Sequence, residues 1–314
     1  MPENNLSQKL TLEVDLAGLK LKNPLITASG TCGNGKELDK YFDINELGAF
    51  TLKGITVNPR KGNKSPRIAE TPSGIINSIG LENPGIDQFI KKTIPEIEEY
   101  KLPFFCNISG YSEAEFLELS KKLAGRKEIA GIEINLSCPN IKGGGLAFGT
   151  DPEVVYSITK KVKNIYDKLV IVKLTPNITD ITEIAEAAES GGADCVSMIN
   201  TISAMKIDVD KQKPLLGSLT GGLSGPAIRP AAVKMVYDTF RKINIPIIGI
   251  GGIRSGRDVI EFMLAGASAA GIGTINMIEA DAALRIIKEI ENYLKKHNIK
   301  KLSSIIGKAH IGNF

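Results

Sequence analysis

The sequence contains few of the residues on which common catalytic and metal sites depend. Its 314 residues include no tryptophan and only two histidines, His297 and His310, both near the end of the chain. A Ser-His-Asp or Cys-His catalytic group is therefore not expected in the body of the chain, and no metal site is expected. Proton transfer there has to use other side chains.

Cysteine is also scarce, with four residues spread along the chain. Cys32, Cys106, Cys138 and Cys195 form no CxxC pair, so their spacing predicts neither a zinc site nor an iron–sulfur cluster. We expect free thiols in a reducing compartment. Cys106 and Cys195 lie inside apolar segments, which is typical of buried cysteines without a chemical role.

The chain has no excess of charge of one sign and no long apolar run. Its 39 basic and 35 acidic residues leave a net charge of +4, which gives no reason to expect a nucleic acid or an anionic membrane as partner. No apolar run approaches the ~20 residues of a membrane-spanning helix. Residues 1–5 are polar and contain no signal-peptide core. We expect a soluble protein of the cytoplasm.

What the chain does contain is a regular alternation of short apolar runs with longer segments of helical spacing. Strands that alternate with helices predict a parallel sheet, and eight units in about 250 residues favour a closed (β/α)8 TIM barrel over a doubly wound open sheet. Hydrophobic residues make up 42% of the sequence, enough for one domain over residues 1–314. The expected strands are 25–30, 49–56, 103–110, 131–138, 169–176, 195–201, 246–253 and 269–274. The expected helices are 84–100, 112–123, 152–166, 178–190, 229–241, 256–265 and 280–297.

Two segments depart from this alternation. Residues 11–23 alternate apolar and polar side chains around Ala17-Gly18-Leu19, which predicts a β-hairpin at the bottom of the barrel, the alternative being a plain N-terminal arm. Residues 72–81 lie in the long loop after the second strand. Their asparagine, serine and glycine residues suit hydrogen bonding to a planar polar ring.

Polar side chains collect where the expected strands end. In such barrels the active site lies at the C-terminal ends of the strands, which a purely structural role would leave mostly apolar. One lysine at a strand end can simply extend to water. Two lysines and three asparagines on one rim instead predict a site for a polar ligand. The rim residues are Ser29, Lys53, Asn107, Asn135, Cys138, Lys173, Asn200, Thr201 and Thr274.

Glycines lie at the ends of the last two expected strands, at Gly251-Gly252 and Gly273, and Gly225 follows the sixth. Glycines also serve tight turns. Loops after strands seven and eight of these barrels often bind phosphate, and glycine lets backbone N–H groups approach it. A phosphate-bearing cofactor is therefore favoured. The open-sheet GxGxxG dinucleotide fingerprint is not supported.

Cys138 stands at a strand end and is followed by Pro139 and Asn140. A thiol facing a ligand can act as a nucleophile or as a base, but the usual histidine partner of a nucleophile is missing. The following residues 141–149 contain three successive glycines. They fit a lid that excludes water, or a plain connection to the helix whose N-cap would be Asp151.

Taken together, these motifs resemble the dihydroorotate dehydrogenase family over nearly the whole chain. The chain resembles class 1 of this family because it has a cysteine at position 138, where the membrane-bound class 2 has a serine. Class 2 also has an N-terminal membrane-associating extension, which this sequence lacks. Within class 1, residues 66–74 and the Gly33-Asn34-Gly35 loop are similar to the 1B catalytic subunit rather than to the fumarate-using 1A form. The segments that carry the resemblance are 28–30, 52–56, 77–81, 135–140, 172–174, 200–201, 225–226, 251–252 and 273–274.

The resemblance implies oxidation of (S)-dihydroorotate to orotate in de novo pyrimidine (UMP) biosynthesis, and a role for each matching residue. Cys138 would be the catalytic base that removes a proton from C5 while hydride moves from C6 to N5 of FMN. The implied substrate-binding residues are Lys53, Asn77, Ser78, Ile79, Gly80, Leu81, Asn135, Asn140, Asn200 and Thr201. The implied FMN-binding residues are Ser29, Lys53, Gly54, Asn107, Asn135, Lys173, Ile199, Gly225, Gly251, Gly252, Gly273 and Thr274.

The resemblance also implies partners. Class 1B pairs the FMN barrel, with one FMN per chain, with an electron-transfer subunit that carries FAD and a [2Fe-2S] cluster and passes electrons to NAD+. The expected assembly is a homodimer of this chain within a heterotetramer. Because the chain has no cluster motif, it fits the catalytic partner.

Three other functions remain open on the sequence. A dihydropyrimidine dehydrogenase-like flavoenzyme also uses a cysteine and FMN. A class 1A enzyme would reduce fumarate unaided. A non-redox phosphate-binding barrel, an isomerase or aldolase, would use Lys173 as a Schiff-base lysine and would lack the yellow colour of a flavin.

Overall fold

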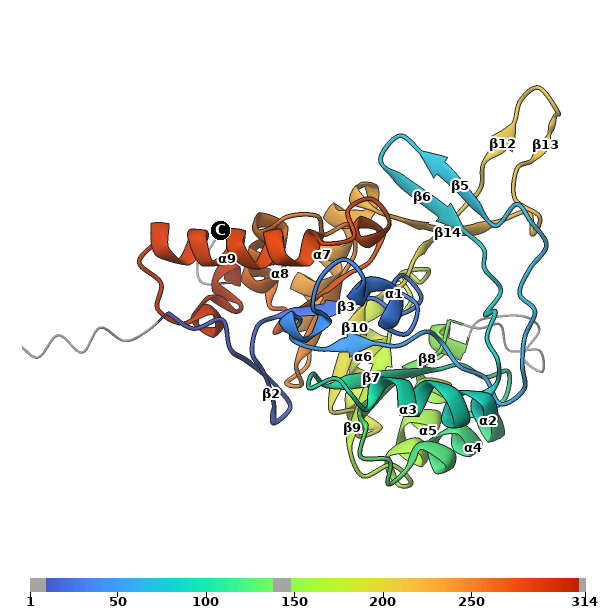
Figure 1. The fold of residues 1–314 in the computed structure, drawn as a ribbon, viewed down its shortest axis with the longest axis horizontal. Coiled ribbons are helices and arrows are strands. Elements are labelled where there is room, and N and C mark those ends of the chain that lie inside the picture. Colours follow the sequence, from blue (N-terminus) through green and yellow to red (C-terminus); the bar gives the residue numbers. More distant parts are fainter. Residues whose placement is uncertain (1–9, 138–147, 311–314) are drawn as a thin grey trace, which may run out of the picture.

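A computed structural model describes residues 10–137 and 148–310 (Figure 1). Eight strands form one parallel sheet in the order β3-β16-β15-β10-β9-β8-β7-β4, and a parallel bridge between Ile26 and Ala49 links its two edges. The predicted (β/α)8 barrel is therefore confirmed. The strands are β3 Leu25–Thr27, β4 Phe50–Thr51, β7 Phe104–Ile108, β8 Ile129–Asn135, β9 Leu169–Lys173, β10 Cys195–Met198, β15 Ile247–Ile250 and β16 Ala269–Ile272.

All eight predicted strands exist, but most end earlier than the apolar runs indicate. The second is the extreme case, because β4 has two residues within the expected 49–56. Beyond the strands the chain turns at the barrel mouth and bonds to neighbouring loops. Ser29 Oγ, for example, donates to the carbonyl of Leu52 at 2.9 Å. Apolar residues such as Ala28 and Leu174 still donate to the neighbouring strand just beyond the assigned strand ends, which explains why the strands were predicted to be too long.

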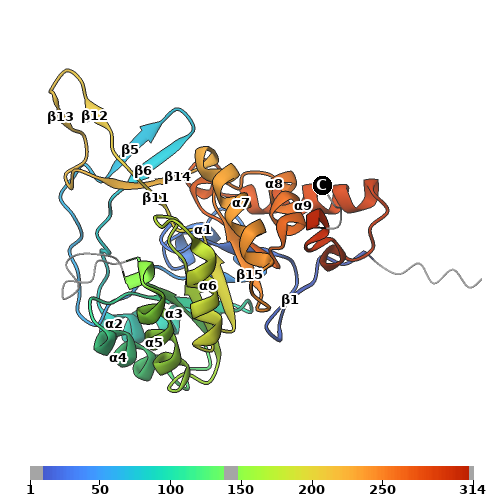
Figure 2. The ribbon, with the colours of Figure 1, turned by 180° about the vertical axis from the view of Figure 1, so that it is seen from behind.

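Helices follow the strands and pack against one another in chain order from α4 to α9 (Figure 2). Polar side chains cap several of them, including the predicted N-cap Asp151, whose Oδ1 accepts from the Glu153 amide at 2.9 Å. The α-helices are α1 Lys36–Asp39, α2 Ile86–Gln88, α3 Ile94–Ile97, α4 Glu113–Leu123, α5 Pro152–Lys163, α6 Ile181–Ser190, α7 Arg229–Phe240, α8 Gly256–Ala265 and α9 Ala282–Lys296. A π-helical turn, η2 Phe89–Thr93, joins α2 to α3. Short 3-10 turns are η1 Ile44–Glu46, η3 Phe148–Thr150, η4 Pro226–Ile228, η5 Thr274–Met277, η6 Leu302–Ile305 and η7 Lys308–His310.

The predicted N-terminal hairpin is confirmed. Strands β1 Val14–Leu16 and β2 Leu19–Leu21 pair antiparallel and lead directly into β3. Leu16 and Leu21 are buried in the main core. The hairpin therefore covers apolar surface at the end of the barrel where β3 begins.

A second sheet, which the sequence analysis did not predict, stands apart from the barrel strands (Figure 1). Its strands pair antiparallel in the order β11-β14-β6-β5. The buried residues Ala69, Ile76 and Leu216 form a small apolar cluster beside it. The assignment of residues 72–81 to a loop was wrong, because residues 74–77 form β6 and pair with β14. The strands are β5 Ile68–Thr71, β6 Gly74–Asn77, β11 Ile202–Ala204 and β14 Gly221–Ser224, and a projecting hairpin pairs β12 Ile207–Asp208 with β13 Lys213–Pro214.

Within residues 10–137 and 148–310, no helix is long and apolar enough to cross a membrane.

Cys106 and Cys195 are fully buried, and this burial raises the pKa of each thiol. We predict that neither reacts with iodoacetamide at pH 8 in the native protein and that both react in denaturant. Peptide mass spectrometry measures this directly. Alkylation of either residue in native protein at the rate of a free thiol would refute their structural role.

Candidate active site

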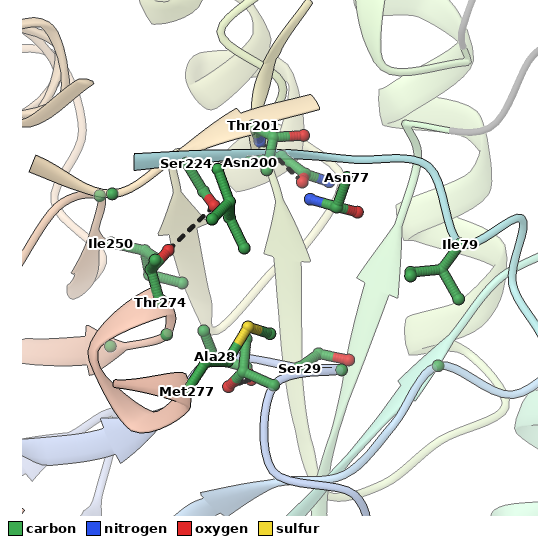
Figure 3. Close-up of a pocket in the computed structure, with 18 of the residues that line it drawn as sticks. Ala28, Ser29, Asn77, Ile79, Asn200, Thr201, Ser224, Ile250, Thr274 and Met277 are labelled. Carbon is green, nitrogen blue, oxygen red and sulfur yellow. Dashed lines mark hydrogen bonds between the residues drawn. The ribbon is translucent and has the colours of Figure 1, made fainter. Parts of the chain in front are cut away.

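A cavity of about 910 Å³ lies between the mouth of the barrel and the second sheet (Figure 3). The barrel contributes residues such as Ser29, Asn135 and Lys173, and the second sheet contributes Ile75 and Asn77. The volume lies near the upper end of the ~300–1,000 Å³ that small-molecule and cofactor sites occupy. It is therefore large enough for a cofactor and a small substrate together.

Every described residue that the sequence analysis assigned to binding lines this one cavity. These residues are Ser29, Lys53, Gly54, Asn77, Ser78, Ile79, Gly80, Leu81, Asn107, Asn135, Lys173, Ile199, Asn200, Thr201, Gly225, Gly251, Gly252, Gly273 and Thr274. The proposed base Cys138, the contact Asn140 and the proposed lid residues 141–147 lie outside the described residues. Ser137, the last described residue before them, lines the cavity.

Amide side chains on one side of the cavity are held by hydrogen bonds to one another. Asn200 Nδ2 donates to Ser137 Oγ at 2.8 Å and to Asn135 Oδ1 at 3.3 Å. Asn135 Nδ2 donates to Ser109 Oγ at 3.1 Å, and Asn200 Oδ1 accepts from the Thr201 amide at 2.8 Å. These bonds fix which way each amide points, so that the site is preorganised for a ligand with both donors and acceptors.

The second sheet brings Asn77 to the same group, where Figure 3 shows it near Asn200 and Thr201. Asn77 Nδ2 donates to the carbonyl of Gly222 on the neighbouring strand β14 at 3.2 Å. Sequence reasoning missed two residues behind this segment. Asn63 Nδ2 and Ser218 Oγ both donate to Ser78 Oγ, at 2.9 and 2.6 Å.

The glycine side of the cavity is closely packed backbone. Gly225 has φ +98°, and Gly252 has φ +69°. A Cβ on Gly252 would lie 2.7 Å from the carbonyl oxygen of Gly225, so only glycine fits there. Next to them, Thr274 Oγ1 donates to Ser224 Oγ at 2.9 Å (Figure 3). Backbone and hydroxyl groups after β14, β15 and β16 thus form a cradle suited to a phosphate group.

Lys173 is the last residue of β9 and is nearly buried, with 6% of its surface exposed. Its Nζ lies 3.4 Å from Oε2 of Glu133, a carboxylate in the middle of β8. Asn107, predicted at a strand end, lies within β7, and its Nδ2 donates to the same oxygen at 2.6 Å. Sequence reasoning missed Glu133 because only strand ends were considered. A single charge inside the apolar run 131–138 was the available signal.

A closed barrel with a polar, glycine-lined cavity at the C-terminal ends of its strands defines the class of (β/α)8-barrel enzymes. The family model described as dihydroorotate dehydrogenase matches residues 11–294. The chain belongs to this family, which confirms the resemblance seen in its motifs.

Several relatives are similar over nearly the full length. The dihydroorotate dehydrogenase B (NAD(+)), catalytic subunit of Caldicellulosiruptor bescii is 52% identical over 302 residues, 96% of this chain and 100% of the relative. The proteins of the same name from Thermoanaerobacter pseudethanolicus and Geobacter sulfurreducens are 50% and 47% identical, covering 96% and 97% of this chain and 100% of each relative.

A solved structure supports the fold. The crystal structure of DHODH in complex with ferulenol from Eimeria tenella matches with a TM-score of 0.82, over 99% of this chain and 92% of that chain. Because its sequence identity is 24%, the match bears on the barrel architecture alone.

We predict that Gly225→Ala destabilises the protein more than Gly125→Ala does. Both glycines have positive φ, which strains an alanine. Gly225, with ψ −173°, also lies in a backbone region that is essentially restricted to glycine, which costs another residue about 1–3 kcal/mol. A Cβ on Gly225 would also lie 2.7 Å from the Gly74 Cα, whereas nothing lies within 4 Å at Gly125. Overpacking should add about 1–3 kcal/mol to the loss at Gly225. Equal free energies of unfolding in urea for the two variants would contradict this packing argument.

Proposed function

We propose that this chain oxidises (S)-dihydroorotate to orotate in de novo pyrimidine (UMP) biosynthesis. The observation that carries the proposal is the meeting of the family's implied binding residues in one cavity of a chain that is 52% identical to a dihydroorotate dehydrogenase B catalytic subunit. The expected location in the cytoplasm stays a prediction.

FMN is the proposed cofactor, and the described residues fit it. Gly225, Gly251, Gly252, Gly273 and Thr274 would hold its phosphate in the backbone cradle. Lys173, from β9, would face the electron-accepting ring system. When bound, FMN supplies the hydride acceptor for C6 of dihydroorotate.

The asparagine group would hold the substrate. Orotate and dihydroorotate carry a carboxylate and an imide edge, and amide side chains can both donate to and accept from such an edge. Asn77, Asn135 and Asn200 offer these groups from β6, β8 and the loop after β10. Lys53 would add positive charge for the carboxylate. Thr201 and the segment 78–81 would complete the contact surface.

Cys138 is the proposed base for the C5 proton. The support comes from the resemblance and from its place in the chain, directly after Ser137, which lines the cavity. A thiol with an ordinary pKa near ~8.5 becomes a competent base as pH rises, so that turnover is expected to increase toward alkaline pH.

An electron-transfer subunit with FAD and a [2Fe-2S] cluster is the proposed partner, with NAD+ as the final acceptor and a heterotetramer as the assembly. The name of the relatives, catalytic subunits of an NAD(+)-linked enzyme, supports a partner subunit. The FAD, the cluster and the heterotetramer rest on the family resemblance.

The substrate test uses the purified chain with an artificial electron acceptor. Dihydroorotate should support turnover and dihydrouracil should not, whereas the reverse would favour a dihydropyrimidine dehydrogenase-like enzyme.

The electron acceptor is tested separately. Fumarate should not serve as acceptor. Reduction of NAD+ should require the electron-transfer subunit, and NAD+ reduction or fumarate-dependent turnover by the chain alone would contradict the proposed division of labour.

We predict that Cys138→Ala retains bound FMN but loses dihydroorotate turnover by about 10²–10⁴-fold, the usual contribution of a positioned base. Flavin absorbance after gel filtration measures the first property, and steady-state kinetics measure the second. Unchanged turnover would rule out Cys138 as the base.

We also predict that Lys173→Ala weakens FMN binding or slows flavin reduction, because it removes a positive charge that would stabilise the reduced cofactor. Fluorescence titration and stopped-flow absorbance check the two effects. Normal values for both would exclude Lys173 from the cofactor site.

A further inference from the structure

A buried carboxylate lies beneath the cavity and has no part in the function proposed above. Glu133 has 3% of its surface exposed. Its Oε1 accepts a hydrogen bond from Ser197 Oγ at 2.7 Å, and its Oε2 accepts one from Asn107 Nδ2 at 2.6 Å. Oε2 also lies 3.4 Å from Lys173 Nζ. Four adjacent barrel strands, β7, β8, β9 and β10, thus meet at one carboxylate.

Glu133 lies two residues before Asn135 on β8 and, unlike Asn135, is not among the residues that line the cavity. Asn107 pairs with Glu133, whereas Lys173 pairs with Asn135, two residues further along β8. Asn107, Asn135 and Lys173 all line the cavity. Lys173 therefore has the cavity on one side and the carboxylate on the other.

The surroundings make this contact electrostatically strong. Lys173 and Glu133 are both nearly removed from water, and charges interact more strongly in such an interior than at the surface. A buried charge is costly unless a partner and hydrogen bonds compensate it. Ser197 and Asn107 supply those hydrogen bonds, one to each oxygen of the carboxylate.

We infer that Glu133 is a positioning residue that sets how strongly the positive charge of Lys173 stabilises the reduced form of the bound flavin. The carboxylate holds the ammonium group at the cavity wall and offsets part of its charge. Positive charge at that place stabilises the reduced, negatively charged flavin, so the offset lowers this stabilisation. The inference rests on the proposed FMN site and gives Glu133 no contact with the substrate or the cofactor.

The variant Glu133→Gln tests this role. It keeps the size of the side chain and one acceptor oxygen but removes the negative charge. We expect the midpoint potential of bound FMN to become more positive, because the charge of Lys173 is no longer offset. Glu133→Asp keeps the charge and serves as the matched control, with a potential close to that of the wild-type protein. The FMN dissociation constant and the thermal unfolding midpoint, measured on the same proteins, report whether the site is intact.

A role in joining strands alone would lower stability without moving the potential in a set direction. An unchanged or more negative potential in Glu133→Gln, in a protein that still binds FMN, overturns the inference. Should Glu133→Gln fail to fold, Ser197→Ala carries the test. That variant removes a donor that partly offsets the charge of the carboxylate, so this charge acts more strongly on Lys173 and the potential should become more negative. No shift, or a shift to more positive values, overturns the inference.

The outcomes for the two proposals are distinguishable. A wild-type protein that binds FMN but does not oxidise dihydroorotate contradicts the proposed function and leaves the comparison of potentials valid. A wild-type protein that binds no FMN contradicts both.

Discussion

The parallel pairing of the eight barrel strands is the constraint on which the site depends. Because every strand runs the same way, all their C-terminal ends open at one face, and the register decides which side chains share a level. Asn135 is opposite Lys173, and Lys173 is opposite Ser197. Asn135 and Lys173, which are far apart in sequence, thereby line the same cavity, and Ser197 reaches the carboxylate of Glu133.

The second sheet completes what the barrel begins. Strands β6 and β14, which belong to distant parts of the chain, pair directly and carry Asn77 to the asparagines of the barrel rim. The close approach of backbone at Gly225, Gly74 and Gly252 fixes this sheet against the loops of the proposed phosphate cradle. The proposed substrate and cofactor contacts would thus depend on the same packing, which suits a reaction between two bound molecules.

Sequence reasoning recovered the barrel and the polar rim residues because both follow from local signals, whereas the wider set of cavity residues came from the family resemblance. Apolar runs separated by helical segments predict the strands, and polar residues after those runs predict the rim. The second sheet was not predicted because β14 begins with two glycines and because β6 and β14 pair across a long stretch of chain. Glu133 was not predicted for a different reason. Its importance depends on its contacts with Ser197, Asn107 and Lys173. These residues come from three other strands and meet at Glu133 only once the barrel strands have paired.

The most direct test of the account is an anaerobic titration of the purified chain with dihydroorotate, followed by flavin absorbance. The account predicts a yellow protein whose flavin band is bleached by about one equivalent of dihydroorotate per chain, since one two-electron oxidation reduces one flavin. A colourless protein, or a flavin band that dihydroorotate leaves unchanged, would contradict it.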